Sequence, residues 1–368
     1  MEYRKLPKGE EMIGTLGLGM GGIQASSKEE IKAVISKAID NGINFFDLCA
    51  GGAKVYEPFG EAIKERREKV YIQVHFGAIY DKNGDYGWSR NLNLIKKTFE
   101  EELKKLQTDY VDFGFLHCVD EENDLKEIEK NGILDYLKEL KNKGVIHHLG
   151  FSSHTPSVAN KVLDLGIMDM MMFSINPAYD LECGDEYGIG STLERAQLFK
   201  RCEVEKVGIS VMKPFLGGQL LSDDTSPFHI ALTKNQCLQY VLDRPSVLVA
   251  VPGVRSMKDL DELLDFLKHE KKENDYSIIG KFTPTNALGN CVYCNHCLPC
   301  PAHIDIGLVN KYYDLSLAGD NIAHNHYYKL KINASACLKC GHCNKRCPFK
   351  VNQEKRMETI KEYFKEEK

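Results

Sequence analysis

The sequence predicts an α/β fold: a barrel of eight parallel strands and eight helices, followed by a small helical domain rich in cysteine. Apolar runs rich in Val, Ile and Phe alternate with segments of helical periodicity. This alternation continues over about 255 residues, the usual length of a (β/α)8 barrel. A charged segment at 266–277 ends the pattern. We therefore expect the barrel over 1–275 and the second domain over 281–368.

The predicted strands are short apolar runs, and each is followed by a helical segment in which Leu, Ile and Phe recur at three- and four-residue spacing. Ser27 stands where a helix cap is expected, and Glu30 follows three residues later in the capping-box position. The eight expected strands are 14–19, 43–47, 70–75, 111–117, 147–151, 170–175, 207–212 and 247–252.

Composition narrows the class of protein. The chain has a formal net charge of −5 and a pI near 6.2, which gives no cue for binding nucleic acid or an anionic membrane. The N-terminus has no apolar secretory core, and no apolar run approaches the length of a membrane span. Thirteen cysteines without a secretory signal indicate a reducing, cytoplasmic location.

Eight of these cysteines form two tight runs near the C-terminus. The second run, CLKCGHCNKRCP, has the CxxCxxCxxxCP spacing of bacterial proteins with two iron–sulfur clusters, in which the fourth cysteine binds the other cluster. The first run, CVYCNHCLPCP, has one residue fewer before its last cysteine. A structural zinc site uses separated pairs of cysteines, and disulfides suit short secreted chains, so both alternatives are disfavoured.

The two runs supply the eight thiolates that two [4Fe-4S] clusters need. By this spacing, one cluster is held by Cys291, Cys294, Cys297 and Cys347, and the other by Cys337, Cys340, Cys343 and Cys300.

Polar side chains close consecutive predicted strands, where the active sites of barrel enzymes lie. Asp47 ends the second strand, His75 the third and His117 the fourth, with Cys118 after it. Each could instead be a buried, hydrogen-bonded structural group. Their position on neighbouring strands favours a working site at one mouth.

Residues 1–268 resemble the aldo-keto reductase family. The similarity is carried by GINFFDLCA with FGEAI, by LKKLQTDYVDFGFLH, GVIHHLGFSSH and GISVMKPFLGG, and by VPGVRS, in the family's order. With the cysteine runs appended, the chain resembles a subgroup of anaerobic bacteria and archaea that joins this barrel to a two-cluster ferredoxin domain.

The resemblance implies a catalytic tyrosine, lysine, aspartate and histidine. Asp47 and His117 match the last two, but Gly52 stands at the tyrosine position and His75 at the lysine position. Tyr56, four residues after Gly52, is a candidate replacement donor. His75 is a candidate proton donor in its own right, because histidine titrates near neutral pH.

The resemblance also implies an NADP(H) site, which this chain retains only in part. Ser152 is kept, Ser153 replaces an asparagine, and Met172 and Met212 replace a glutamine and a stacking aromatic. VPGVRS keeps phosphate-contacting candidates, although its arginine could equally be a surface cation; these are Gly253, Arg255 and Ser256.

Other residues border the expected mouth. Lys213 closes the seventh strand, where it could form a Schiff base, bind an anion or remain solvated. Cys49 and Cys118 could be activated thiols or inert buried ones. The long segment after the third strand is expected to form a lid loop, with Trp88 as a wall over the substrate; it also carries Asp81, Asp85 and Arg90.

The sequence therefore predicts an iron–sulfur oxidoreductase whose barrel exchanges electrons with a small-molecule substrate through two clusters, with ferredoxin or a similar redox carrier as partner. Two alternatives stay open. One is an NADP(H)-dependent carbonyl reductase with structural or regulatory clusters, and the other is a non-catalytic electron-transfer subunit. Nothing in the sequence indicates the oligomeric state.

Overall fold

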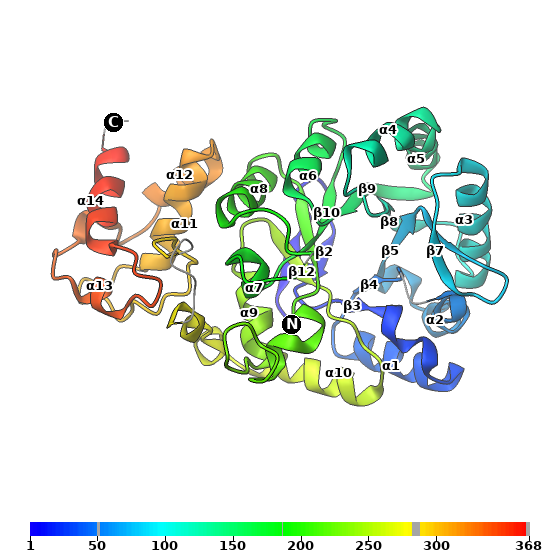
Figure 1. Cartoon of the computed structure of the whole chain (residues 1–368), viewed down its shortest axis with the longest axis horizontal. Helices are drawn as coiled ribbons and strands as arrows, with labels where there is room; N and C mark the ends of the chain where they lie inside the picture. Colours follow the sequence, from blue (N-terminus) through cyan, green and yellow to red (C-terminus); the bar gives the residue numbers. More distant parts are fainter. Residues whose placement is uncertain (50–51, 186, 282–287, 366–368) are drawn as a thin grey trace.

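A closed barrel forms the larger part of the molecule (Figure 1). The computed structural model describes residues 1–49, 52–185, 187–281 and 288–365. Eight parallel strands follow one another around the sheet, and parallel bridges from Leu16 to Ala250 and from Gly19 to Gly253 close it. The strands are β3 (Leu18–Gly19), β4 (Phe45–Asp47), β5 (Tyr71–Phe76), β8 (Val111–Leu116), β9 (Ile146–Ser153), β10 (Met170–Ser174), β11 (Gly208–Met212) and β12 (Val247–Ala250).

Helices surround the sheet (Figure 1). Ser27 caps the first of them, and its hydroxyl accepts a hydrogen bond from the Glu30 amide at 3.2 Å, as the sequence predicts. The outer helices are α1 (Lys28–Asp40), α2 (Tyr56–Ile63), α3 (Leu92–Leu106), α4 (Glu122–Lys130), α5 (Ile133–Asn142), α6 (Pro156–Leu163), α8 (Thr192–Val204), α9 (Lys234–Leu242) and α10 (Met257–Leu264), with the short α7 (Pro177–Asp180) after β10.

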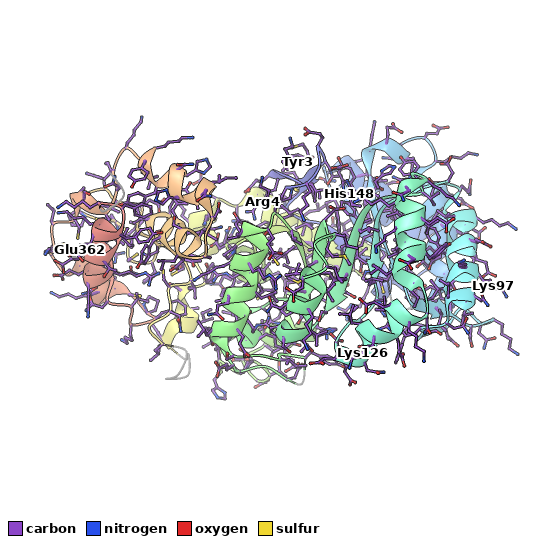
Figure 2. All side chains as sticks on the ribbon, turned by 90° about the horizontal axis from the view of Figure 1, so that it is seen from above. Tyr3, Arg4, Lys97, Lys126, His148 and Glu362 are labelled. Atoms are coloured by element: carbon purple, nitrogen blue, oxygen red, sulfur yellow. The ribbon has the colours of Figure 1, made fainter. Side chains whose placement is uncertain are left out.

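The N-terminus forms a hairpin that the sequence pattern did not predict. β1 (Tyr3–Lys5) pairs antiparallel with β2 (Met12–Gly14), so the expected first strand at 14–19 is reduced to β3. Arg4 ties the hairpin to the barrel through hydrogen bonds to the carbonyls of Leu242 and Val247 (Figure 2). The hairpin's Leu6 and Ile13 join the core inside the barrel.

Side chains fill the barrel interior because alternate residues of each strand point inward. Phe45, Phe113, Phe115, Met170 and Val249 belong to this inner core, and all are fully buried. The same alternation continues toward the carboxyl ends of the strands, and so positions polar residues at the mouth.

The segment after β5 is a hairpin rather than the loop that the sequence predicted. β6 (Ala78–Tyr80) pairs antiparallel with β7 (Tyr86–Trp88), with Tyr80 opposite Tyr86. Asp81 closes the turn by accepting hydrogen bonds from the amides of Asn83 and Asp85. We call residues 78–88 the lid hairpin.

The C-terminal part lies beside the barrel, at the left in Figure 1. It has a small core of its own, in which Tyr327 stacks on Phe364 at 3.6 Å between ring centroids. It contacts the barrel through α8 and α11, and Arg244 after α9 donates to the Val292 carbonyl. Its helices are α11 (Ile306–Leu317), α12 (Asn321–Tyr328), α13 (His342–Arg346) and α14 (Gln353–Tyr363).

Within the described residues, none of the helices has both the length and the apolar character that crossing a bilayer requires.

Candidate functional site

The strand ends bring Asp47, His75 and His117 together, as the sequence predicts. His75 Nε2 lies 3.0 Å from Asp47 Oδ1, and His75 Nδ1 lies 3.3 Å from His117 Nδ1. All three side chains are buried. Neighbouring parallel strands carry them, because β4 pairs with β5 and β5 pairs with β8.

Gln73 completes the inner side of this group. Its amide donates to Asp47 Oδ1 at 2.9 Å, and its carbonyl accepts from the Ser210 hydroxyl at 3.2 Å. Sequence reasoning missed Gln73, although it lies two residues before His75 and therefore on the same inward face of β5. Gln73 fixes the Asp47 carboxylate beneath His75.

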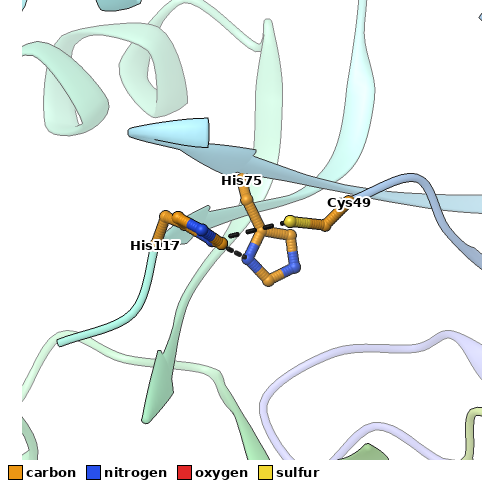
Figure 3. A group of neighbouring side chains, drawn as sticks. All are labelled: Cys49, His75 and His117. Carbon is orange, nitrogen blue, oxygen red and sulfur yellow. Dashed lines mark hydrogen bonds between the residues drawn. The ribbon is translucent and has the colours of Figure 1, made fainter. Parts of the chain in front are cut away.

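Two further side chains reach His117 from outside the strands. Tyr86, on the lid hairpin, places its hydroxyl 2.6 Å from His117 Nε2. Cys49, two residues after β4, places its sulfur 3.5 Å from His117 Nδ1 (Figure 3). The sequence pointed to Cys49 as a residue near the mouth, but Tyr86 was not foreseen because its approach depends on the folding of the lid hairpin.

Burial sets the charge of these groups. It lowers the pKa of His117 well below its usual value, and the neighbouring His75 lowers it further, so His117 is neutral near pH 7. Burial also raises the pKa of Tyr86, so its hydroxyl carries a proton at the same pH. Burial, followed by the charge of Asp120, raises the pKa of Cys118 to about 11, which disfavours a thiolate there.

Gly52 stands where the resemblance places a catalytic tyrosine, and the lid hairpin closes that position. A Cβ at residue 52 would lie 2.9 Å from the Gly84 carbonyl oxygen, and the Gly52 φ of 138° also disfavours any other residue. Tyr56, the candidate replacement, lies in α2, where its buried hydroxyl donates to the Leu48 carbonyl at 2.8 Å and meets Tyr80 at 3.1 Å. The Tyr56 hydroxyl is thus bonded to Leu48 and Tyr80 and does not lie at the expected donor position.

Glu102 is buried next to Tyr56, and burial raises its pKa to about 8. Between about pH 4.5 and 8 this carboxyl is ionised when the chain is unfolded and protonated when it is folded, so stability falls as pH rises through this window. We expect Glu102→Gln to raise the free energy of unfolding at pH 9 by on the order of 2–4 kcal/mol, and with it the melting temperature by several degrees. At pH 4.5 the substitution should have little effect on stability. Melting curves of the full chain at both pH values measure this, with the exposed Glu101→Gln as control. Equal shifts at the two pH values would contradict the assignment.

Lys213, another predicted mouth residue, belongs to a second polar group. Lys213 Nζ lies 3.3 Å from His154 Nε2 and above the Tyr187 ring. His154 Nδ1 contacts Asp120 Oδ2 at 3.0 Å. Lys213 therefore lies among polar and aromatic partners at the end of β11, and its role stays a prediction.

The lid residues have different surroundings. Trp88 is 60% exposed, with the Arg90 guanidinium over its ring, so in this structure it does not form the expected wall. Arg90 is buried and donates to the carbonyls of His117 and Cys118. Asp81 and Asp85 form the hairpin turn.

The expected cofactor residues are spread along the mouth. The Ser152 hydroxyl accepts from the Cys118 amide at 2.9 Å, and Ser153 donates to Asp120 at 3.2 Å. Ser256 caps α10, and Arg255 is 79% exposed beside Asp259. A Cβ at Gly253 would have no atom within 4 Å, so there is open space in front of α10.

The C-terminal cysteines gather in two neighbourhoods that match the predicted groups, and Cys297 borders both. Burial, with smaller contributions from the charges of Cys291 and Cys347, raises the pKa of Cys294 to about 12. Burial also raises the pKa of Cys297, with smaller contributions from the charges of Cys291, Cys294 and Cys347. Cys300, from the first run, lines one cavity with the three leading cysteines of the second run, Cys337, Cys340 and Cys343, and Cys297 borders the same cavity.

The two runs also share one backbone conformation. The residues on either side of the second cysteine are left-handed in both: Tyr293 and Asn295 have φ of 60° and 62°, and Lys339 and Gly341 have 50° and 66°. Alternating handedness turns successive amides toward one centre, which favours an anionic group there. The Lys339 amide donates to Cys337 Sγ at 3.5 Å, and the Tyr293 amide makes the equivalent bond to Cys291.

Comparisons with known proteins concern the barrel. The uncharacterised oxidoreductase YqkF of Bacillus subtilis is 26% identical over 283 residues, which covers 71% of this chain and 90% of that protein. An aldo-keto reductase of Bacillus halodurans in its holo form matches with a TM-score of 0.60 and 21% identity over 73% of this chain and 92% of its own. An aldo/keto reductase of Klebsiella pneumoniae in complex with NADP and acetate matches with a TM-score of 0.57 and 19% identity over 77% and 95% of the two chains.

The family model described as "Aldo/keto reductase family" matches residues 12–236, which is more than half of the chain and ends before both cysteine runs. Together with the closed eight-stranded barrel, this match identifies the barrel. The chain belongs to the aldo/keto reductase family, whose members are oxidoreductases.

Proposed function

We propose that this protein interconverts a carbonyl group and an alcohol on a small molecule at the barrel mouth, with NADP(H) as hydride carrier. The comparisons favour this function over electron supply through iron–sulfur clusters, because the Klebsiella relative binds NADP and the family match covers the barrel alone. The observation that carries the proposal is the 2.6 Å contact between the Tyr86 hydroxyl and His117 Nε2. It supplies a tyrosine where Gly52 leaves none.

Carbonyl reduction needs a hydride at carbon and a proton at oxygen. NADPH supplies the hydride when it is bound, and Tyr86 is protonated and so able to supply the proton. The neutral His117 can donate a hydrogen bond from Nε2 to the Tyr86 oxygen, which stabilises the phenolate until Tyr86 takes up a proton from solvent. Asp47 and Gln73 hold His75, which in turn supports His117. In the oxidising direction the same groups accept the proton from the alcohol.

The residues present fit a dinucleotide better at its phosphate end than at its ring. Arg255 and Ser256 stand beside the open space at Gly253, where phosphate oxygens would find a cation and a helix start. Around the ring, Ser153 already donates to Asp120, and the Met172 sulfur accepts from Gln73. The nicotinamide would therefore find few free hydrogen-bonding groups.

NADPH is accordingly expected to bind weakly. Loss of amide and aromatic partners at Ser153, Met172 and Met212 costs on the order of 1 kcal/mol each. Two such losses, about 2 kcal/mol together, raise the dissociation constant about 30-fold compared with a family member that keeps these groups. Anoxic fluorescence titration measures this, with the Klebsiella enzyme as reference. Met172→Gln is expected to tighten binding, and micromolar binding by the unaltered chain would show that other groups hold the ring.

The same titration tests the function. With saturating NADPH and a panel of short aldehydes and ketones, oxidation of NADPH coupled to formation of the alcohol supports the proposal. If no carbonyl compound in the panel is reduced although NADPH is bound, carbonyl reduction with NADPH is excluded for this panel.

A second function is favoured by the cysteine groups. We infer that the C-terminal segment 281–368 is a ferredoxin-type domain that holds two [4Fe-4S] clusters, which pass single electrons between the mouth and ferredoxin or a similar carrier. The donor set fits, since two groups of four thiols lie on loops of matching conformation, and one group packs against the barrel core through Cys291, Cys294 and Cys347. Turnover with a reduced carrier and without NADPH would favour this function, and strict dependence on a partner enzyme would favour a non-catalytic subunit.

A further inference from the structure

We propose that Cys49, His75 and His117 bind one zinc ion at the barrel mouth and leave its fourth coordination position open. The three side chains come from segments that follow or form three adjacent strands, β4, β5 and β8. One ligand atom from each lies within 4.8 Å of the other two, and all three residues are buried (Figure 3). A thiolate with two imidazoles is a donor set that suits zinc, whereas magnesium and calcium prefer oxygen ligands.

Two of the three distances between the ligand atoms match the edges of a tetrahedral zinc site, and the third, between Cys49 and His75, is within 4.8 Å. Bond lengths of about 2.0–2.1 Å to nitrogen and about 2.3 Å to sulfur give tetrahedral edges of about 3.3 Å between two nitrogens and about 3.5 Å between nitrogen and sulfur. His75 Nδ1 and His117 Nδ1 are 3.3 Å apart, and Cys49 Sγ is 3.5 Å from His117 Nδ1. The two imidazole rings are nearly perpendicular, with an angle of 84° between their planes.

The outer nitrogens of both imidazoles already have partners. His75 Nε2 contacts Asp47 Oδ1 at 3.0 Å, and His117 Nε2 contacts the Tyr86 hydroxyl at 2.6 Å. A metal-bound histidine characteristically donates its other ring N–H to a carboxylate or another acceptor, which fixes the tautomer and orients the ring. Both rings thus direct Nδ1 toward the common centre.

A chain of hydrogen bonds without metal is the competing explanation. In such a network the Cys49 thiol lies 3.5 Å from His117 Nδ1 and the Ser152 hydroxyl lies 3.4 Å from His75 Nδ1, so each ring has another partner. A continuous chain from Tyr86 through His117 to His75 and Asp47 would add a hydrogen bond between the two Nδ1 atoms. Their 3.3 Å separation is longer than the usual range of about 2.7–3.2 Å for a nitrogen donor, whereas both outer contacts lie at 3.0 Å or less. The distance between the two Nδ1 atoms therefore fits two ligands of one metal ion better than a hydrogen-bond donor and its acceptor.

The open position gives the ion a role that rests on the proposed function. A zinc ion with three protein ligands binds and polarises an oxygen in its fourth position. At this mouth the oxygen would belong to the substrate carbonyl, with Tyr86 beside it as proton donor. Zinc undergoes no redox change, so both electrons still come from the hydride.

Metal analysis of the anoxically purified full chain, with its cysteine runs intact, tests the site. We expect about one zinc per chain in addition to any iron, and loss of that zinc in both Cys49→Ala and His117→Ala. Iron content and melting temperature identify variants that have simply failed to fold. Cys118→Ala, which removes the adjacent thiol outside the three ligands, is the matched control and is expected to keep the zinc.

A second readout avoids the cysteine runs. Cobalt in place of zinc should give a thiolate-to-metal absorption band that disappears in Cys49→Ala and persists in Cys118→Ala. Equal zinc in Cys49→Ala and the unaltered chain, or an intensely blue copper complex instead of a zinc one, would overturn the assignment. Zinc retained without any carbonyl reduction would reject the proposed function alone, and reduction without zinc would reject this inference alone.

Discussion

Tyr86→Phe is expected to lower turnover by roughly 10² to 10⁴, the usual contribution of a positioned acid or base. The substitution removes only the hydroxyl that lies 2.6 Å from His117 Nε2, and it leaves the aromatic ring on the lid hairpin. The proton for the substrate oxygen would then have no donor beside the mouth. Steady-state kinetics with whichever carbonyl compound is reduced measures the loss.

Tyr80→Phe is the matched control for this prediction. Tyr80 lies opposite Tyr86 in the same hairpin, but its hydroxyl contacts Tyr56 behind the mouth. We expect its removal to cost about 1 kcal/mol of stability, the net value of one hydrogen bond, with little change in turnover. If both tyrosine variants lost turnover equally, the effect would come from distortion of the hairpin and Tyr86 would not be the donor.

Replacing His75 or His117 should lower turnover by a factor of the same size. His75→Ala and His117→Ala are each expected to lower turnover by roughly 10² to 10⁴ while both cysteine groups, once loaded with iron, stay reducible by dithionite. His117 contacts Tyr86 directly, and His75 lies beside His117 with the two Nδ1 atoms 3.3 Å apart. Full activity of His75→Ala would exclude it from the proton path and leave Tyr86 with His117 alone.

The barrel was predictable from sequence because its signal is local. Short apolar runs alternating with helix-period segments indicated all eight strands, and the ends of these runs placed Asp47, His75 and His117 at one mouth. Gln73 lies two residues before His75, on the same inward face, and could have been found with it.

The lid hairpin was not predictable in this way. Its strands β6 and β7 are three residues each, too short for a periodic signal, and they pair only because the turn around Asp81 and Gly84 forms. Tyr86 reaches His117 as a consequence of that tertiary pairing. Gly52 shows the same limit: sequence reveals the missing tyrosine, but only the fold shows that the Gly84 carbonyl fills its place.

The cysteine groups are intermediate between these cases. Spacing alone assigned Cys347 to the first group and Cys300 to the second, and the structure brings these residues together in the same way. What spacing could not show is that Cys291, Cys294 and Cys347 pack against the barrel core. The remaining member of the first group, Cys297, packs against the small C-terminal core together with Cys300, Cys337 and Cys343. Apart from Cys297, the two groups therefore have different neighbours, which makes them experimentally distinguishable.

Anoxically purified or reconstituted protein is expected to hold about eight iron and eight sulfide per chain, and Cys347→Ser or Cys300→Ser should each lower both values to about four. Each variant removes one thiolate from a different group of four, since Cys347 completes the Cys291 group and Cys300 the Cys337 group. Iron and sulfide analysis, with electron paramagnetic resonance of the reduced protein, measures the loss. Cys183→Ser, outside both runs, is the control and should keep all eight iron.

Cys347→Ser and Cys300→Ser should also differ in which part of the structure is loosened when a cluster is lost. Loss of the group beside the barrel should loosen the contact between α8 and α11 and the Arg244 bond to Val292, because Val292 lies between Cys291 and Cys294. Cys347→Ser should therefore increase hydrogen exchange in α8, whereas Cys300→Ser should increase it around α13 and leave α8 unchanged. Identical exchange patterns would show that the groups are divided differently. Protein that takes up only zinc under iron and sulfide reconstitution would end the case for electron transfer through this domain and leave NADP(H) as the source of electrons at the mouth.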